Sequence, residues 1–189
     1  MRTLILLASA ACFAAVPAAP VPIELSAPEL IVNGSFEEGP TVDVYVSLDE
    51  KSTEMKGWTV TRGQIDYCVA HWKAADGKRS LDLHGSPGFG GVKQTIKTEK
   101  GRMYRVAFMM AGNPGVATKL MTLAVFANNS SKKFEFDCTG KTLEEMGWVK
   151  KTWDFKADAE ETVIEIATAM TTEEFAGPAL DNVSVKLVK

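Results

Sequence analysis

Two acidic residues near opposite ends of the sequence stand where a hydrophobic core is expected. Glu37 follows Phe36 in the stretch NGSFEEGP, and Asp181 precedes the alternating run NVSVKLV. Asp181 shares its strand phase with Val183 and Val185, which is the apolar phase of that run. An ionised carboxylate that points inward is costly unless it meets a cation, several hydrogen-bond donors or a raised pKa.

A single cation satisfies both carboxylates if the first and last strands of the fold are neighbours. Calcium accepts about six to eight oxygen ligands in irregular geometry, including backbone carbonyls. The sequence therefore makes Glu37 and Asp181 candidate ligands of a structural calcium ion. In the alternative, Glu37 is exposed and Asp181 accepts backbone N–H groups at a turn.

Aromatic and polar residues between positions 58 and 113 are candidates for a sugar site, which needs a flat apolar face surrounded by hydrogen-bonding groups. Trp72 stands in the loop-like stretch AHWKAADGKRS and is the best candidate for stacking, with burial under that loop as the alternative. Trp58 and Trp153 are expected in the core. The candidate ligand contacts are Trp72, Tyr67, Asp66, His71, Arg79 and Asn113.

Catalytic signatures are weak, so no enzyme is predicted. The stretch HGSPGFGG, residues 84–91, does not have the spacing of a nucleophile elbow and is typical of a turn between strands. His84 is expected at the surface, at the end of a strand. Asp66 and Asp82 would serve as the acid and base of a glycosidase only at a suitable separation, which the sequence does not give.

The segments that position these residues have the period-2 pattern of β-strands. Apolar residues recur at every second position in residues 80–85, 103–112, 120–127, 132–138, 151–157, 162–168 and 181–188, and Gly, Pro, Asn or Asp separates most of these runs. Many short strands at near-regular spacing predict an all-β fold, an antiparallel β-sandwich of the jelly-roll type. Residues 142–146 have room for one helical turn.

The N-terminus has the layout of a secretory signal peptide. One positive charge at Arg2 precedes an apolar run from Leu4 to Val16 and then small residues, so residues 1–18 are predicted to be a signal peptide. Residues 19–29 are predicted to be a leader, and residues 30–189 are predicted to form a single β-sandwich domain. With no second long apolar segment and no C-terminal anchor, the mature chain is expected to be secreted or periplasmic, without a membrane span.

Charge and cysteine content narrow the class of partner. A net charge of −3 with no basic block makes nucleic acid a poor partner. Cys68 and Cys138 remain after processing, and in an oxidising compartment they either form a disulfide or stay as two separate buried thiols.

Six blocks of the sequence carry a resemblance to a known family. The stretches NGSFEEGP, GWTVTRGQIDYCVAHWKAADGKRSLDLHG, SPGFGGVKQTIKT, YRVAFMMAGNP, MGWVKKTWDF and GPALDNVSV occur in the order found in one group of secreted proteins. The chain resembles domain-of-unknown-function family 642 in its bacterial choice-of-anchor C form, from about residue 30 to residue 185. Members of that form usually carry a C-terminal sorting anchor, which this protein is expected to lack.

The resemblance implies a galactose-binding-like jelly roll, similar to many carbohydrate-binding modules. In such modules a Glu after the first strand and an Asp entering the last strand share a structural calcium ion, and Glu37 and Asp181 are the matching positions. We therefore expect a secreted, non-catalytic protein that recognises extracellular or cell-wall polysaccharide. The alternatives are a structural or adhesive envelope protein that binds other proteins and, less favoured, a polysaccharide hydrolase.

Overall fold

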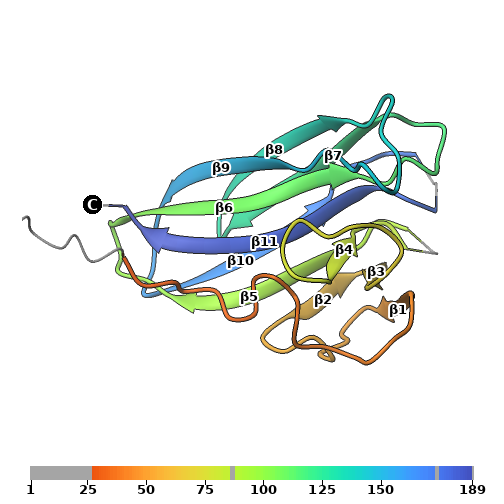
Figure 1. Cartoon of the computed structure of the whole chain (residues 1–189). Coiled ribbons are helices and arrows are strands. Elements are labelled where there is room, and N and C mark those ends of the chain that lie inside the picture. The colour runs from red at the N-terminus through yellow and green to blue at the C-terminus, as the bar shows by residue number, and fades with distance from the viewer. Residues whose placement is uncertain (1–26, 86–87, 173–174, 189) are drawn as a thin grey trace, which may run out of the picture.

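The alternating segments form β-strands, because a strand places successive side chains on opposite faces. The computed structural model describes residues 27–85, 88–172 and 175–188. Within them the strands are β1 (Tyr45–Asp49), β2 (Thr59–Arg62), β3 (Gln64–Cys68), β4 (Ser80–Asp82), β5 (Gly91–Lys97), β6 (Met103–Gly112), β7 (Leu120–Ala127), β8 (Ser130–Asp137), β9 (Val149–Lys156), β10 (Glu161–Thr168) and β11 (Pro178–Leu187) (Figure 1).

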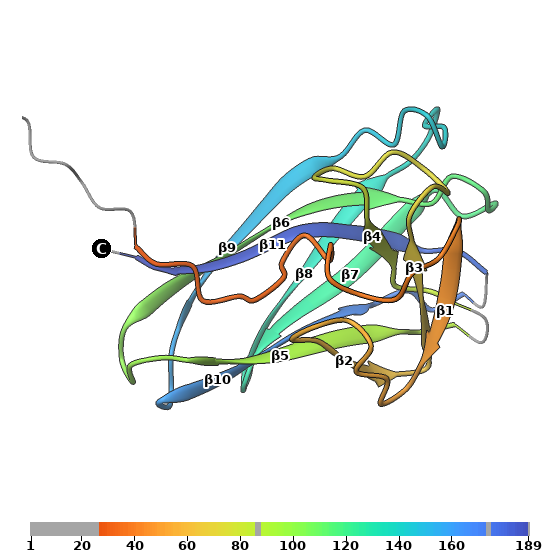
Figure 2. The same cartoon turned by 60° about the horizontal axis from the view of Figure 1, so that its bottom comes forward.

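The strands form two antiparallel sheets that pack face to face. The six-stranded sheet has the order β1-β3-β4-β11-β6-β9, and the five-stranded sheet has the order β2-β5-β10-β7-β8. Figure 2 shows the two layers, with β6, β9 and β11 in one and β2, β5 and β10 in the other. The predicted antiparallel sandwich is therefore confirmed. The described residues contain no helix, and residues 142–146 form a turn in which Glu145 N donates to the carbonyl oxygen of Thr142 at 3.2 Å.

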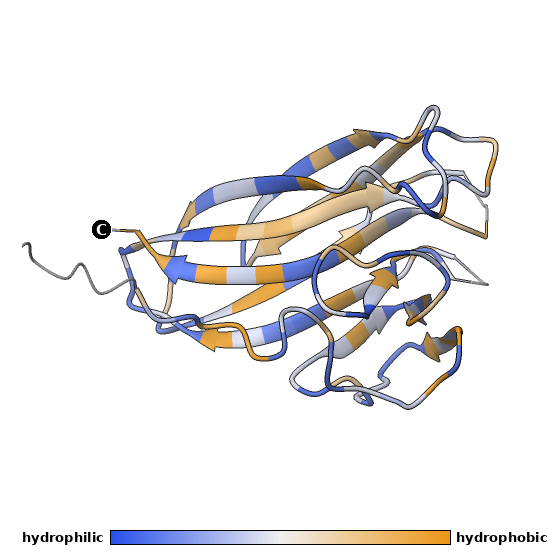
Figure 3. Cartoon of the chain, in the orientation of Figure 1, coloured by the Kyte–Doolittle hydropathy of each residue, from blue (hydrophilic) through white to orange (hydrophobic). Residues whose placement is uncertain are grey.

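The core lies between the sheets and is built from the predicted apolar phases. On β6, Val106, Phe108 and Met110 are no more than 1% exposed, and on β7 Met121 and Leu123 are fully buried. Figure 3 shows hydrophobic and hydrophilic residues alternating along β11, whereas β6 is hydrophobic over most of its length. Burial of one face of each strand is what fixes their register.

The first and last segments of the described chain lie side by side (Figure 2). Leu30 N donates to the carbonyl oxygen of Val185 at 3.0 Å, and Val183 N donates to that of Gly34 at 2.8 Å. Residues 29–34 thus pair with the half of β11 that the three-residue strand β4 does not reach. The predicted adjacency of chain start and chain end is confirmed, although the first segment is not a regular strand.

A bulge in β11 overturns the predicted phase of Asp181. The register against β6 shifts between Asp181 and Ser184, and Asn182 adopts a φ of 46°. Asp181 therefore lies opposite Met109 on the outer face of the six-stranded sheet, whereas Val183 faces the core. Asp181 is nevertheless fully buried, because the loop between β3 and β4 covers it.

Part of the predicted domain organisation lies outside the described residues. The predicted signal peptide at residues 1–18 and residues 19–26 of the predicted leader belong to that part. In the part of the chain that is described, no helix has the length and apolar character needed to cross a membrane.

The two cysteines are not paired with each other. Cys68 ends β3 in the six-stranded sheet, and Cys138 follows β8 in the five-stranded sheet; both are free and buried. Burial raises the pKa of each thiol, so neither forms a thiolate readily.

Candidate functional site

The loop of residues 69–79, between β3 and β4, crosses the outer face of the six-stranded sheet and meets Asp181. Asp181 Oδ2 accepts hydrogen bonds from the backbone N–H groups of Ala75, at 2.8 Å, and Asp76, at 2.9 Å. Its Oδ1 accepts one from Asn182 N at 2.6 Å. These bonds fix the first half of the loop to β11.

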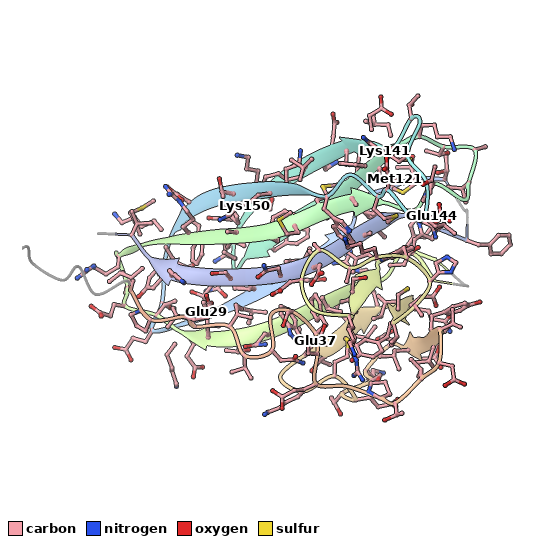
Figure 4. The ribbon with its side chains drawn as sticks, viewed as in Figure 1. Glu29, Glu37, Met121, Lys141, Glu144 and Lys150 are labelled. Carbon is pink, nitrogen blue, oxygen red and sulfur yellow. The ribbon has the colours of Figure 1, made fainter. Side chains whose placement is uncertain are left out.

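The second half of the same loop meets Glu37. Glu37 Oε1 accepts hydrogen bonds from Lys78 N at 2.7 Å and Arg79 N at 2.8 Å. Gly77 stands between the two sets of donors with a φ of +61°, and a Cβ at this position would lie 2.4 Å from Glu37 Oε1. The turn therefore requires glycine, and it brings together two acids from the start and end of the described chain. Figure 4 shows Glu37 beneath this loop.

Glu37 and Asp181 supply some, but not all, of the oxygen ligands that a bound cation needs. Among the described residues no donor reaches Glu37 Oε2, while burial raises the pKa of Asp181 to about 7 even though the backbone donors lower it. The described residues contain no group of three or more His, Cys, Asp or Glu side chains placed to hold a metal ion. A calcium ion here would need backbone carbonyl oxygens in addition to the two carboxylates, a mixture that calcium accepts.

Arg79 and Tyr67, two predicted ligand contacts, form a part-buried contact with each other behind the turn. Arg79 Nη1 donates to the Tyr67 hydroxyl at 2.6 Å, and that hydroxyl donates to the carbonyl oxygen of Phe36 at 2.7 Å. The guanidinium carbon lies 5.4 Å from the centre of the Tyr67 ring. Tyr67 is fully buried, so these two predicted contact residues hold the 36–40 segment in place.

Trp72 is buried under the loop, which is the alternative to the stacking role stated in the sequence analysis. It is 6% exposed, and its indole N–H donates to Ser80 Oγ at 2.7 Å. No open indole face is left for a sugar ring, so the structure does not support the predicted stacking role. Trp72 instead anchors the loop to β4.

Two predicted residues, Asp66 and His71, lie with Tyr45 and Ser47 in an exposed group that we call the Tyr45 patch. The Tyr45 ring is 52% exposed and meets the His71 ring edge-on at 5.6 Å. His71 rests in turn on Trp72 at 5.1 Å. Asp66 Oδ1 accepts a hydrogen bond from Ser47 Oγ at 2.6 Å, and partial burial raises the pKa of Asp66.

Tyr45 was not among the candidate ligand contacts predicted from the sequence, although its position in a strand pattern could have identified it. In the stretch VYVSLD, Val46 and Leu48 occupy the apolar phase of a strand, so Tyr45 and Ser47 must face the other way. An aromatic residue on the outward phase of an edge strand is a better candidate for stacking than a Trp in an unassigned loop.

Asp82 joins three loops at the other end of β4. Its Oδ1 accepts hydrogen bonds from His84 N and Gly177 N, each at 3.0 Å, and its Oδ2 accepts one from Asn113 Nδ2 at 3.0 Å. Burial raises the pKa of Asp82 to about 7. Asn113, a predicted ligand contact, is therefore a buried partner of Asp82.

His84 does not lie at the surface as predicted from its strand phase. It is fully buried, and its ring packs on Phe89 at 4.9 Å. The outward phase of β4 is covered by loops, which an isolated strand pattern cannot reveal. Asp82 shares this burial, and it pairs across the strands with Asp66.

Comparison with known families identifies one model that matches nearly all of the described chain. The model described as "Protein of unknown function (DUF642)" matches residues 29–186. A curated relative, halomucin from Haloquadratum walsbyi, is 27% identical over 164 residues, which are 84% of this chain and 2% of halomucin. The chain thus spans a very small part of that relative's length.

Solved structures with a similar fold include carbohydrate-binding modules. TmCBM61 in complex with β-1,4-galactotriose has a TM-score of 0.52 at 16% identity, over 85% of this chain and 99% of that chain. A family 16 carbohydrate-binding module has a TM-score of 0.50 at 17% identity, over 85% and 99%. The arabinose-bound α-L-arabinofuranosidase MgGH51 has a TM-score of 0.56 at 10% identity, over 86% of this chain and 27% of the enzyme. At these identities the similarity establishes the fold.

Proposed function

The chain belongs to the DUF642 family, and from that premise we propose that it binds extracellular or cell-wall polysaccharide without cleaving it. The observation that carries the proposal is the Tyr45 patch, an exposed aromatic ring beside a carboxylate and an imidazole on a rigid sheet edge. The fold shared with a module that binds β-1,4-galactotriose supports it.

The Tyr45 patch offers both interactions that a sugar needs. The apolar face of a sugar ring stacks on the phenol of Tyr45, and its hydroxyl groups meet the imidazole of His71 and the carboxylate of Asp66. Because β1 and β3 hold Ser47 and Asp66 in register, little side-chain freedom is lost on binding. The patch is shallow, so we expect modest affinity.

The surroundings of Asp66 and Asp82 support recognition over hydrolysis. A glycosidase needs two carboxyl groups that flank the scissile bond. Asp82 is 2% exposed and accepts hydrogen bonds from three loops. It therefore cannot contact a ligand that binds next to Asp66. We therefore propose a non-catalytic role.

The proposal also includes a structural calcium ion and export from the cell. Glu37 and Asp181 would hold the ion at the 75–79 turn, where it would add positive charge between the two acids. Residues 1–18, predicted to be a signal peptide, would direct the chain to the periplasm or the exterior, and the bacterial choice-of-anchor C form remains the predicted subgroup.

Two experiments test the proposed function. A glycan microarray identifies the polysaccharides that the protein binds, and affinity electrophoresis then measures the affinity for each of them. We expect Tyr45→Ala to weaken binding about tenfold or more, which corresponds to about 1.4 kcal/mol of stacking. Tyr45→Phe keeps the ring and should retain most of the affinity. Phe175→Ala, which removes a ring that is 79% exposed on the segment before β11, is the matched control and should leave binding unchanged.

Three results would overturn the proposal. They are the absence of binding to any glycan by the folded protein, binding that Tyr45→Ala leaves intact, and release of reducing sugar ends from a bound polysaccharide. The third result would restore the hydrolase alternative.

A further inference from the structure

A hollow lies on the outer face of the six-stranded sheet, away from β1 and over β6, β9 and β11. It is open to solvent, has a volume of about 350 Å³ and is lined by Ala107, Phe108, Met109, Lys150, Asn182 and Ser184. The hollow exists because the small side chains of Ala107 and Ser184 face each other across β6 and β11. Figure 4 shows Lys150 on β9 beside β6.

The bulge in β11 presents an unused amide to this hollow. Asn182 has a φ of 46°, a conformation that is unfavourable for a residue with a Cβ, and its side chain is exposed. Within the described residues its side-chain amide makes no hydrogen bond. Left-handed residues and bulges are over-represented at binding sites, where they aim a side chain outward.

Lys150 is the one charged side chain among the described residues that line the hollow, and the acids around the hollow are held by other groups. Asp154 forms a bidentate pair with Arg105, at 2.6 and 2.7 Å, and Asp181 accepts backbone N–H groups. Glu29 accepts from Val185 N at 2.8 Å and from the Ser184 hydroxyl. Lys150 has no ion pair or hydrogen bond to any described residue, so its ammonium is available to a ligand.

We infer that this hollow binds a carboxylate-bearing sugar unit, a uronic acid, within the polysaccharide. The Lys150 ammonium meets the carboxylate, and the Asn182 amide and the Ser184 hydroxyl oxygen meet the ring hydroxyls. The inference rests on the proposed function, because it assumes that the ligand is a polysaccharide. It goes beyond the proposed function in two respects. It specifies that one sugar unit of the ligand carries a carboxylate, and it places a second contact on the same sheet face as the Tyr45 patch.

Polygalacturonate and its fully methyl-esterified form provide a matched pair of probes, since they share one backbone and differ in charge. In affinity electrophoresis we expect the acidic polymer to bind about tenfold more tightly than the ester. Lys150→Ala should remove that difference and leave binding of the ester unchanged. Lys151→Ala is the matched control, because Lys151 neighbours Lys150 on β9 but points to the opposite face. Asn182→Gly, which keeps the backbone conformation, should weaken acidic binding about threefold.

The outcomes separate this inference from the proposed function. If neither polymer nor any arrayed glycan binds, both are wrong. If neutral glycans bind through Tyr45 but the acidic polymer gains nothing from Lys150, only the uronic-acid site is wrong. Equal binding of poly-L-glutamate would show that the hollow reads charge alone, and would also overturn it.

Discussion

Asp82 is the residue at which burial and ionisation conflict most directly. Three donors hold its carboxylate and lower its pKa, but full burial outweighs them and raises the pKa to about 7. Asp66 faces it from the neighbouring strand and adds a second negative charge. The folded state therefore favours the protonated acid, in contrast to an unfolded Asp, whose pKa is near 3.9.

This conflict predicts stability that falls as the pH rises. A raised folded-state pKa means that the folded protein binds more protons than the unfolded chain between about pH 4 and pH 7. The contribution of Asp82 is complete below pH 4 and is lost as the pH rises through 7, by on the order of 1 kcal/mol per pH unit. Urea unfolding at pH 4.5, 5.5, 6.5 and 7.5 measures it.

Asp82→Asn should reduce this slope without abolishing it, because an amide does not titrate but Asp181, whose pKa burial also raises to about 7, still does. Asp43→Asn, at an exposed position, should keep the slope of the unchanged protein. A variant Asp82→Asn that loses stability with pH as steeply as the parent would show that other acids, such as Asp66, are responsible.

Among the elements, the loop of residues 69–79 does most to shape the face on which the candidate site lies. It contacts β4 through Trp72, β11 through Asp181 and the N-terminal segment through Glu37. Trp148 adds a hydrogen bond from its indole N–H to the carbonyl oxygen of Lys73 at 2.9 Å. The loop thus covers part of the outer face of the six-stranded sheet and is fixed there by the buried side chain of Trp72.

This anchoring predicts a structural phenotype for Trp72. Trp72→Ala should lower the free energy of unfolding by about 3 kcal/mol or more, because a large buried side chain is removed. Trp72→Phe should cost less, since it keeps most of the volume and loses one hydrogen bond, which accounts for about 1 kcal/mol. Thermal unfolding checks the order, and glycan binding by folded Trp72→Phe should be unchanged. A stable Trp72→Ala that no longer binds glycan would restore the stacking role predicted from sequence.

Local patterns predicted seven of the described strands, β4 and β6 to β11, but neither β1, β2, β3 and β5 nor the loops that cover the sheets. Alternation placed Phe108 and Met110 inside, because burial of a strand face depends on residues close in sequence. The burial of Asp82 and His84 depends on loops from distant parts of the chain, which local patterns do not encode. The phase of Asp181 was wrong for another reason: a bulge at Asn182 shifts the alternation by one residue.

At the scale of the whole molecule, the chain closes on itself at one turn. Residues 29–34 pair with β11, and the 75–79 turn receives Glu37 from the start of the chain and Asp181 from the end. The family resemblance predicted that these two acids belong together, and the sandwich brings them to the same loop. The structure shows the alternative stated for Asp181, acceptance of backbone N–H groups at a turn. The donor residues, Ala75 and Asp76, could not be identified from the sequence, because backbone N–H groups have no residue signature.

The last prediction concerns the contact between the two ends of the chain at the 75–79 turn. It tests whether backbone N–H groups alone stabilise this contact or whether a cation is also needed. A calcium ion that binds only the folded state stabilises it by about 2.7 kcal/mol at a concentration 100-fold above its dissociation constant. For a domain of this size, that corresponds to a rise in Tm of about 5–10 °C. We expect the rise in calcium relative to EGTA, with magnesium ineffective because it demands tighter octahedral geometry.

Glu37→Gln tests the site, because it keeps the size of the side chain and removes its charge. The variant should lose the calcium response, whereas Glu38→Gln, at the neighbouring acid that pairs with Lys56 at 2.6 Å, should keep it. If the Tm of the parent protein is the same in calcium and in EGTA, the backbone N–H groups around Gly77 are sufficient. The two ends of the chain are then joined by hydrogen bonds alone, and the closure of the sandwich needs no metal.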